Sequence, residues 1–228
     1  MKKIRTLLVQ FDNELSHYEV SAFRGAVIEK VGRENILFNH HLDDTKYLFK
    51  YPLIQYKSIR KRPAVLCLGE GVEEIHKLFN QSTWGINLKG NKVDLKIDKL
   101  DLGNFTLNVW DKSEQYRLFN WIALNGENFK RFTALENEME KLEMLEKILV
   151  GNILSFAKGI GWDVEKEIKV RINKTERTKS INYKNTRLLA FDIEFSTNAF
   201  LPNNIGLGKG VSHGYGIVRK VNKKEKNE

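Results

Sequence analysis

The order of the predicted strands and helices constrains the fold of this chain most, because nearly the same order occurs twice. Segments in which apolar residues recur at helical spacing predict helices, and alternating or short continuous apolar runs predict strands. In the first half these patterns lie at Ile4–Phe11, Glu19–Val31, Tyr47–Tyr56, Ala64–Leu68, Val72–Asn80, Lys92–Ile97 and Phe105–Trp110. Glu19–Val31 and Val72–Asn80 are helical, so with the last two strand segments counted together the predicted order is βαββαβ.

The second half of the chain repeats most of this order. An aromatic-rich alternating segment, Tyr116–Leu124, predicts a strand, and a long helix with a continuous apolar stripe follows at Leu135–Ala157. Two strands joined by a polar turn are expected at Glu167–Ile172 and Thr186–Phe195, and a last short strand at Gly216–Lys220. The second helix is shortened or missing. We expect the long helix to cover the second sheet, with packing in a homodimer as the alternative.

Two successive split βαβ units predict an α+β protein built from two tandem ferredoxin-like (βαββαβ) domains with antiparallel sheets. The second domain has a reduced second helix and a glycine-rich loop before its last strand. We expect an N-terminal domain at residues 1–112, a C-terminal domain at residues 113–220 and a disordered basic tail at residues 221–228. The duplication is visible in the element order alone, since no residue-level repeat accompanies it.

The composition is that of a soluble globular protein. Of 228 residues, 41% are hydrophobic and 29% are charged, which excludes a disordered or collagen-like chain. Cys67 is the only cysteine, so an internal disulfide and a cysteine-rich zinc site are excluded, and a reducing compartment is favoured. No apolar run approaches the ~20 residues of a membrane span. We therefore expect a cytoplasmic protein without a membrane partner.

The positive charge of the chain is concentrated in two segments that are poor in acidic residues. The formal net charge is +9. The stretch Thr45–Arg62 has no acidic residue, and Ile168–Ala190 has only Glu176. Such clustering is typical of proteins that bind a phosphate backbone, although a solvated basic strand face is the alternative. The basic residues predicted to contact nucleic acid are Lys46, Lys50, Lys169, Arg171, Lys174, Arg177 and Lys179.

The segment Gly206–Gly216 contains five glycines among eleven residues. Glycine permits positive φ and close approach of backbone N–H groups to an anion, so the segment predicts a phosphate cradle. It leads into the last strand, unlike a Rossmann motif, and it lacks the Gly-Lys-Ser/Thr of a P-loop. A loop packed under a sheet is the alternative. The loop residues predicted to bind are Gly206, Gly208, Lys209, Gly210, Ser212, His213, Gly214 and Gly216.

The glycine spacing, Gly-φ-Gly-x5-Gly-φ-Gly with Leu207 and Tyr215 at the φ positions, resembles the C-terminal loop of the CRISPR-associated RNA-processing endoribonucleases of the RAMP superfamily. Three segments of the N-terminal half are similar to the b-type branch of the Cas six family. They are Phe23-Arg-Gly-Ala-Val, Phe38-Asn-His-His-Leu and Tyr51-Pro-Leu-Ile-Gln-Tyr-Lys57. Residues 80–200 match in element order alone.

The resemblance implies a metal-independent endoribonuclease that cuts precursor CRISPR RNA within its repeats. In that family the 2′-hydroxyl attacks the adjacent phosphate, which leaves a 2′,3′-cyclic phosphate and a 5′-hydroxyl. No cofactor is implied. The expected partners are CRISPR repeat RNA, and further the subunits of a CRISPR effector complex or a second copy of the chain.

His40 and His41 lie where the resembling family carries its catalytic histidine, so we expect both in the site. Histidine can act as base or acid at neutral pH. Adjacent residues of a strand point to opposite faces, so in an extended segment only one of them easily reaches the scissile phosphate. His41 is slightly favoured over His40, and the roles of base and acid stay unassigned. Tyr47 is expected to orient or deliver a proton, and Lys46 or Lys50 to neutralise the phosphorane. A metal site is the weaker interpretation of the histidine pair, because no third ligand is identifiable.

The other histidines have lesser roles in this prediction. His17 is a reserve candidate for the site, His76 is expected on the surface, and His213 is expected to contact RNA or pack the glycine loop. Two other functions stay open at this point. One is a non-catalytic subunit that binds guide RNA, for which the histidines are incidental; the other is a nucleotide-binding enzyme that uses the glycine loop alone.

Overall fold

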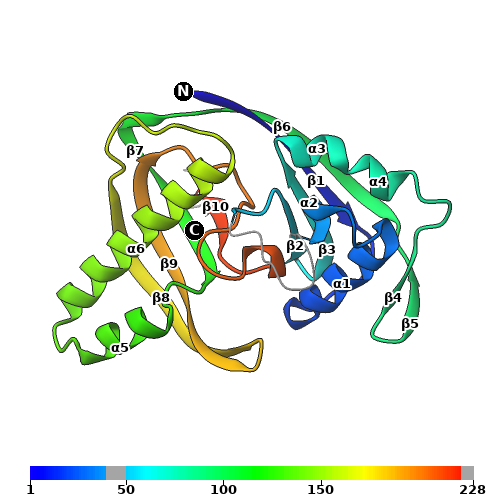
Figure 1. The fold of residues 1–228 in the computed structure, drawn as a ribbon. Coiled ribbons are helices and arrows are strands. Elements are labelled where there is room, and N and C mark those ends of the chain that lie inside the picture. Colours follow the sequence, from blue (N-terminus) through cyan, green and yellow to red (C-terminus); the bar gives the residue numbers. More distant parts are fainter. Residues whose placement is uncertain (40–49, 222–228) are drawn as a thin grey trace, which may run out of the picture.

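The computed structural model describes residues 1–39 and 50–221 (Figure 1). The elements of the first half are β1 (Lys2–Phe11), η1 (His17–Glu19), α1 (Val20–Val31), α2 (Ile36–Asn39), β2 (Ile54–Ile59), β3 (Arg62–Leu68), α3 (Glu70–Glu74), α4 (His76–Phe79), β4 (Gly85–Leu88), β5 (Asn91–Asp94) and β6 (Ile97–Leu107). Those of the second half are β7 (Val109–Trp121), α5 (Gly126–Ala134), α6 (Glu138–Gly159), β8 (Val170–Tyr183), β9 (Thr186–Ala199), η2 (Val211–His213) and β10 (Ile217–Lys220).

The first sheet is antiparallel and has the strand order β2-β3-β1-β6. With β6 counted as the fourth strand of the unit, this is the 2-3-1-4 order of a βαββαβ fold. Phe23 and Val27 of α1 are buried against one face of the sheet, together with Tyr56 of β2. The ferredoxin-like prediction for this half is confirmed.

The second sheet repeats the order as β10-β7-β9-β8, again antiparallel. Helix α6 buries Leu145, Leu149, Ile153 and Phe156, and its stripe covers this sheet as predicted. The position of the second helix is occupied by the short η2 within the glycine-rich segment, so the prediction of a reduced helix is confirmed. Strands β8 and β9 form a long hairpin whose turn residues Lys184 and Asn185 have φ of +48° and +62°.

Several elements of the first half differ from the prediction. The segment predicted as one strand at Lys92–Ile97 is divided between β5 and β6, and β4 and β5 form a separate hairpin that turns at Lys89 and Gly90 with positive φ. The predicted strand Tyr47–Tyr56 is, in its described part, extended only from Ile54. The predicted second helix is two short helices, α3 and α4.

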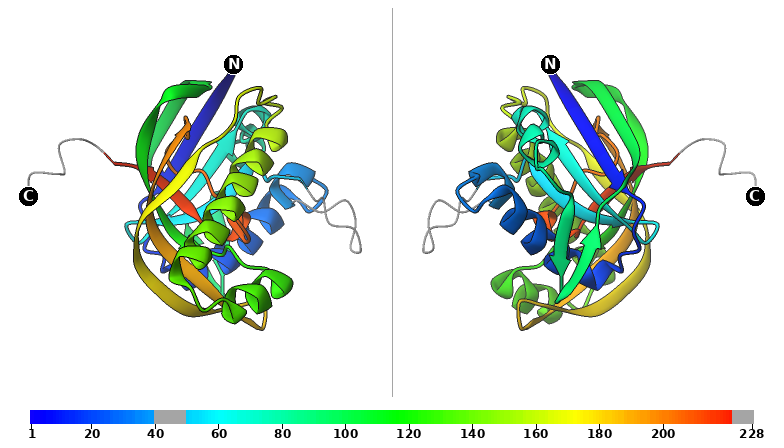
Figure 2. Two further views of the ribbon diagram at one scale, coloured as in Figure 1. Left: turned by 90° about the vertical axis from the view of Figure 1, so that its left-hand side faces the viewer. Right: turned by 90° about the vertical axis from the view of Figure 1, so that its right-hand side faces the viewer.

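The two domains are joined closely in the chain and in space. Asn108 alone separates β6 of the first sheet from β7 of the second, and the boundary predicted between Lys112 and Ser113 falls inside β7. The face of the first sheet opposite α1 shares a hydrophobic cluster with the second domain, and Tyr51 packs edge-on against Phe156 of α6 at 5.2 Å. Figure 2 shows the ribbon of both domains from its two sides, with α6 lying across the strands of the second sheet. In the described part of the chain no helix is long and apolar enough to cross a membrane.

Candidate nucleic-acid interface

The glycine-rich segment lies between the two domains and is hydrogen-bonded to both. The Gly206 N–H donates to Gln55 Oε1 at 3.0 Å, and Tyr51 Oη donates to the Gly206 carbonyl at 2.8 Å. On the side of the second domain, the Lys209 and Gly216 N–H groups donate to the carbonyls of Ile122 and Asn120. Figure 1 shows η2 in the centre of the molecule, where it packs against β2 and α1.

Close packing explains two of the glycines directly. Gly216 has φ of +65°, and a Cβ there would stand 1.8 Å from the Leu207 carbonyl oxygen. Gly208 has φ of +88°, and a Cβ would meet Trp121 at 2.7 Å. Part of the glycine pattern therefore serves the packing of the loop under the sheet.

The structure separates the predicted loop residues by exposure. Gly206, Gly214 and Gly216 are buried, and their N–H groups donate to protein acceptors. Lys209 is exposed, and four further residues are half-buried, namely Gly208, Gly210, Ser212 and His213. A ligand that approaches the loop from solvent can therefore contact Lys209 and the exposed side of η2, whereas the buried glycines are covered.

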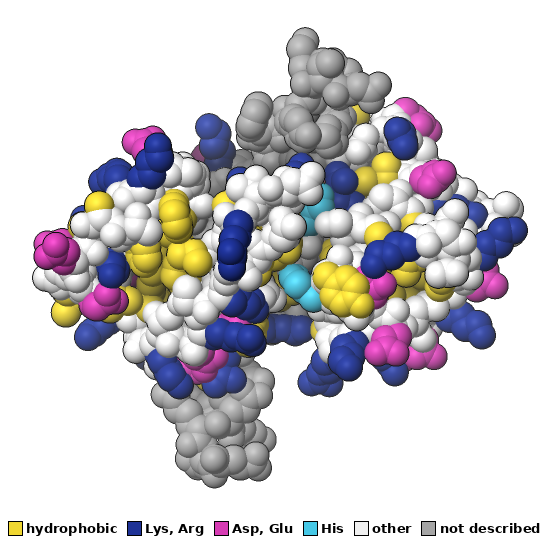
Figure 3. All heavy atoms as spheres, turned by 90° about the horizontal axis from the view of Figure 1, so that it is seen from below, with side chains coloured by type: hydrophobic (Ala, Val, Ile, Leu, Met, Phe, Trp, Pro, Cys, Tyr) yellow, Lys and Arg dark blue, Asp and Glu magenta, His cyan; other side chains and the backbone are white. Residues whose placement is uncertain are grey.

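Aromatic rings from three elements meet beside η2. Tyr215 packs edge-to-face against His17 of η1 at 4.9 Å and against Tyr183 of the β8–β9 hairpin at 5.5 Å, and Tyr183 packs against His213 at 5.7 Å. Lys209 Nζ stands 5.8 Å from the centre of the Tyr183 ring. Seen from below, histidine side chains lie between the two halves of the molecule with lysine and arginine side chains around them (Figure 3). The reserve candidate His17 thus belongs to the domain interface.

The environment of His17 favours the neutral form of its imidazole. Burial lowers the pKa of its imidazole below the ordinary 6.5, the nearby charges of Lys179 and Lys57 lower it further, and Asp192 opposes them. Its Nε2 is buried and has no hydrogen-bond partner among the described residues.

The basic residues predicted on the hairpin lie on β8 or immediately before it. Lys169, Arg171, Lys174 and Arg177 are exposed, and Lys179 is half-buried with its Nζ 3.4 Å from an Asp192 carboxylate oxygen. Lys174 has a long contact of 3.9 Å with Glu176. These side chains present positive charge along one strand, as a phosphate backbone requires.

The predicted residues His40, His41, Lys46 and Tyr47 lie outside the described residues. The residues before them are held by the first domain: Tyr56 Oη donates to the Phe38 carbonyl at 3.2 Å, and Arg24 donates to the Asn39 carbonyl. After them, Lys50 is exposed, and Tyr51 is buried and bonded to the glycine-rich segment. The two flanks are therefore anchored to the first domain and to the interdomain loop.

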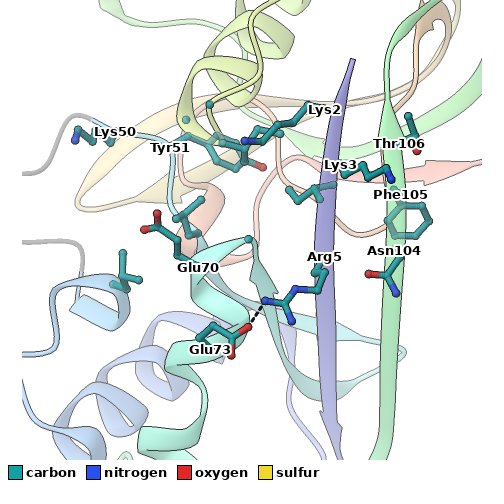
Figure 4. A pocket seen from close by; sticks show the side chains of 17 residues that line it. Lys2, Lys3, Arg5, Lys50, Tyr51, Glu70, Glu73, Asn104, Phe105 and Thr106 are labelled. Atoms are coloured by element: carbon teal, nitrogen blue, oxygen red, sulfur yellow. Dashed lines mark hydrogen bonds and ion pairs between the residues drawn. The ribbon is translucent and has the colours of Figure 1, made fainter.

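Lys50 also lines a cavity of about 1040 Å³ at the start of β1 and the end of β6. Figure 4 shows Lys2, Lys3, Arg5 and Lys50 around it, with Arg5 in an ion pair with Glu73. Tyr51 forms part of its wall. Within the described ranges, no group of three or more His, Cys, Asp and Glu side chains could hold a metal ion.

Sequence reasoning missed the special environment of Lys57. It counted this lysine in the basic stretch, but its side chain is wholly buried, and its Nζ has no hydrogen-bond partner among the described residues. Burial and the charge of Arg219 lower its pKa from 10.5 to about 7. The alternation of β2 was the available signal, since Gln55 and Ile59 share the face of Lys57 and both contact the second domain.

Comparison with known proteins agrees with this fold over nearly the whole chain. The family model described as the Cas6b N-terminal domain matches residues 2–106, and the Cas6b C-terminal domain matches residues 108–221. A crystal structure of Cas6b superposes with a TM-score of 0.87 at 26% identity, covering 96% of this chain and 100% of that chain.

Two further structures and one sequence are similar. A crystal structure of a CRISPR RNA processing endoribonuclease Cas6b has a TM-score of 0.73 at 25% identity, with 96% of this chain and 100% of that chain covered. Csf5, a type IV Cas6 crRNA endonuclease, shares the fold at 12% identity, with a TM-score of 0.64 over 97% of this chain and 100% of that one. The uncharacterized protein MJ0978 of Methanocaldococcus jannaschii is 41% identical over 101 residues, which are 44% of this chain and 67% of that protein.

Proposed function

The chain belongs to the Cas6b family of CRISPR RNA processing endoribonucleases, and from this premise we propose the reaction that it catalyses and the residues that carry it. The observation that carries the proposal is the match of both domains to Cas6b family models, supported by a TM-score of 0.87 to a Cas6b crystal structure. The substrate is precursor CRISPR RNA, cut within its repeats to release guide RNAs.

The proposed reaction is a transesterification without a metal ion. The 2′-hydroxyl loses its proton to a base and attacks the adjacent phosphorus, while the bond to the 5′ oxygen breaks and that oxygen takes a proton from an acid. The products are a 2′,3′-cyclic phosphate and a 5′-hydroxyl. Proton transfer of this kind contributes about 10²–10⁴-fold to a rate.

His40, His41 and Tyr47 are the residues that we propose for proton transfer, with Lys46 and Lys50 stabilising the phosphorane charge. Support comes from the described flanks of this segment. Asn39 is held by Arg24 of α1, and Tyr51 is held by the glycine-rich segment, so both ends of the segment are attached to rigid parts of the fold.

The RNA is proposed to lie across the domain interface. Exposed basic residues of β8, with Lys209 and the η2 end of the loop, would contact its phosphates. Phosphate contacts position RNA without specifying bases, and they make affinity fall with salt. The same proposal places the protein in the cytoplasm, with the subunits of an effector complex or a second copy of the chain as further partners.

The test is cleavage of the host's CRISPR-repeat RNA in EDTA. We expect wild-type protein to cut it, and the double variant His40→Ala with His41→Ala to cut at least about 10²-fold more slowly while binding RNA as before. His76→Ala is the matched control, because His76 is exposed on α4.

Undiminished cleavage by the double variant would remove the assignment of these histidines. A 2′-deoxy nucleotide just upstream of the cut should abolish cleavage, and persistent cutting would contradict attack by the 2′-hydroxyl. An inactive wild-type protein that still binds the repeat would favour the non-catalytic subunit instead.

A further inference from the structure

A second cavity, of about 760 Å³, lies between the two sheets. Its wall combines residues of the first domain, such as Gln10 of β1 and Arg60 of the β2–β3 turn, with Arg117 of β7 and Arg219 of β10 from the second. Asn204, from the segment before the glycine-rich loop, completes one side. The cavity therefore exists only where the two domains meet.

Most cations around this cavity are neutralised by acidic partners, but two are not. The paired ones are Arg62 with Asp12 and Asp98, Lys99 with Asp101, Arg117 with Glu194, and Lys220 with Glu114. Arg60 and Arg219 line the cavity and have no ion pair or side-chain hydrogen bond to another residue in the described part of the chain. Arg219 is half-buried, and this burial together with the positive charge of Arg60 disfavours the charged form of its guanidinium.

Lys57 does not line the cavity itself, but its amine interacts electrostatically with Arg219. Its side chain is wholly buried, its Nζ finds no partner in residues 1–39 or 50–221, and Arg219 is the charged group that acts on it. On the opposite wall Asn204 is 7% exposed, and its buried Oδ1 also lacks a partner there. Buried polar groups normally have hydrogen-bond partners, so this region contains more unpaired polar atoms than a packed interface does.

The chemistry of the unpaired arginines and of Asn204 indicates which class of ligand the cavity can bind. Arg60 is exposed and Arg219 is half-buried, and because their like charges repel each other, an anion between them relieves the repulsion. Guanidinium groups match phosphate oxygens in geometry. The acidic residues of the wall, Asp98 and Asp101, are engaged in ion pairs, so they leave no free carboxylate for a metal cation. The Asn204 oxygen accepts a hydrogen bond, which a ribose hydroxyl could donate.

We propose that this cavity is a phosphate-binding site in which Arg60 and Arg219, backed by Lys57, hold one backbone phosphate of the RNA. The inference rests on the proposed function for the identity of the ligand. Lys57 also acts electrostatically on His17 of the aromatic cluster. Sequence reasoning assigned none of these three residues to the site.

The first test measures binding of a repeat RNA made uncleavable by a 2′-deoxy nucleotide at the cut. Arg60→Gln and Arg219→Gln should each weaken binding about tenfold and reduce the slope of log affinity against log salt by about 0.7, the value for one phosphate on a single strand. Lys61→Gln is the matched control, because Lys61 is an exposed cation in the same turn that does not line the cavity. Losses no greater than those of the control would overturn the proposal.

The second test uses proton uptake, which a purely structural lysine would not show. Since the folded pKa of Lys57 is about 7, binding of a phosphate at Arg219 at pH 8 should favour the charged form of Lys57 and take up a proton. Calorimetry in two buffers of different ionisation enthalpy should detect this uptake in the wild type and find it reduced in Lys57→Met. Equal uptake in both proteins would contradict the role of Lys57.

A third arm separates RNA phosphate from free phosphate. Inorganic phosphate at matched ionic strength should not raise the melting temperature more than chloride does if the site requires a phosphodiester on RNA. Phosphate stabilisation that Arg219→Gln abolishes, together with unchanged RNA affinity, would overturn RNA as the source. Because every readout is binding, failure of cleavage would count against the proposed function and not against this site.

Discussion

At the scale of single residues, Lys57 is the most unusual side chain of the protein. Burying an ammonium group without a partner is unfavourable, and proteins keep such groups where they are used. The charge of Arg219 on β10 acts unfavourably on its ammonium group, and Lys57 acts in turn on His17 of η1. The residue is therefore costly to the free protein and suited to a bound anion.

Removal of this charge should stabilise the free protein in a pH-dependent way. The folded pKa of Lys57, about 7, lies below the ordinary 10.5, so unfolding takes up a proton between these values and wild-type stability rises with pH in that window. The penalty is full below pH 7 and amounts to roughly 4–5 kcal/mol. We expect urea unfolding to show Lys57→Met more stable than wild type by a larger margin at pH 6 than at pH 10.

The matched control is Lys61→Met, which removes an exposed charge from the adjacent turn and should change stability little at any pH. A gain for Lys57→Met that is the same at pH 6 and pH 10 would show that the lysine is charged in the folded protein throughout.

At the scale of elements, the glycine-rich segment combines two interpretations that the sequence left open. Its buried glycines, such as Gly206 and Gly216, pack the chain between the domains, whereas Lys209 stays exposed. The segment replaces the second helix of the fold, so the backbone that a helix would have satisfied internally bonds instead to Gln55, Asn120 and Ile122. The loop therefore connects the two domains and also exposes the positive charge of Lys209.

Two glycine substitutions should act in opposite directions. Gly216→Ala places a methyl group 1.8 Å from a carbonyl oxygen at a φ of +65°, so we expect a loss of about 3 kcal/mol or more in the free energy of unfolding. Gly151→Ala, within α6 and with nothing within 4 Å of its Cβ, should gain about 0.5–1 kcal/mol. Urea unfolding measures both, and a tolerated Gly216→Ala would mean that the loop repacks easily.

At the scale of the whole molecule, the two domains share one hydrophobic cluster, so we expect them to unfold as one unit. The first sheet is covered by α1 on one face and by the second domain on the other, with a shared hydrophobic cluster that includes Leu8, Leu66 and Phe156. Tyr51 is the main polar link, since its hydroxyl donates to Gly206 and accepts from Gln55. The phosphate-binding cavity depends on this docking.

Loss of the Tyr51 hydroxyl should therefore destabilise both domains. Tyr51→Phe leaves the Gly206 carbonyl without its donor, which we expect to lower the free energy of unfolding by about 1–3 kcal/mol. Hydrogen exchange should show faster opening of both β1 and β9, and Tyr18→Phe, at a tyrosine that is 76% exposed, should show neither effect. Faster exchange in one domain alone would contradict a single folding unit.

The elements missed by sequence reasoning are short or lack a strong apolar period. Helix α5 has no buried residue, so its periodicity was uninformative; its one readable signal was Asn125, whose side chain accepts from the Asn128 N–H at 2.7 Å as an N-cap. The β4–β5 hairpin was hidden because each strand has four residues. Long, periodic elements such as α6 were predicted well because burial of one face leaves a clear pattern.

The sequence by itself determined the two ferredoxin-like units, the glycine spacing and the resemblance to the family, because these follow from local periodicity and from residue types at set intervals. Only the tertiary structure decided which charges are buried and unpaired. A strand pattern separates the two faces of β2, but it does not say what covers each face. Docking of the second domain against the first sheet enclosed Lys57 and brought Arg219 beside it, and that step depends on residues more than 150 positions apart.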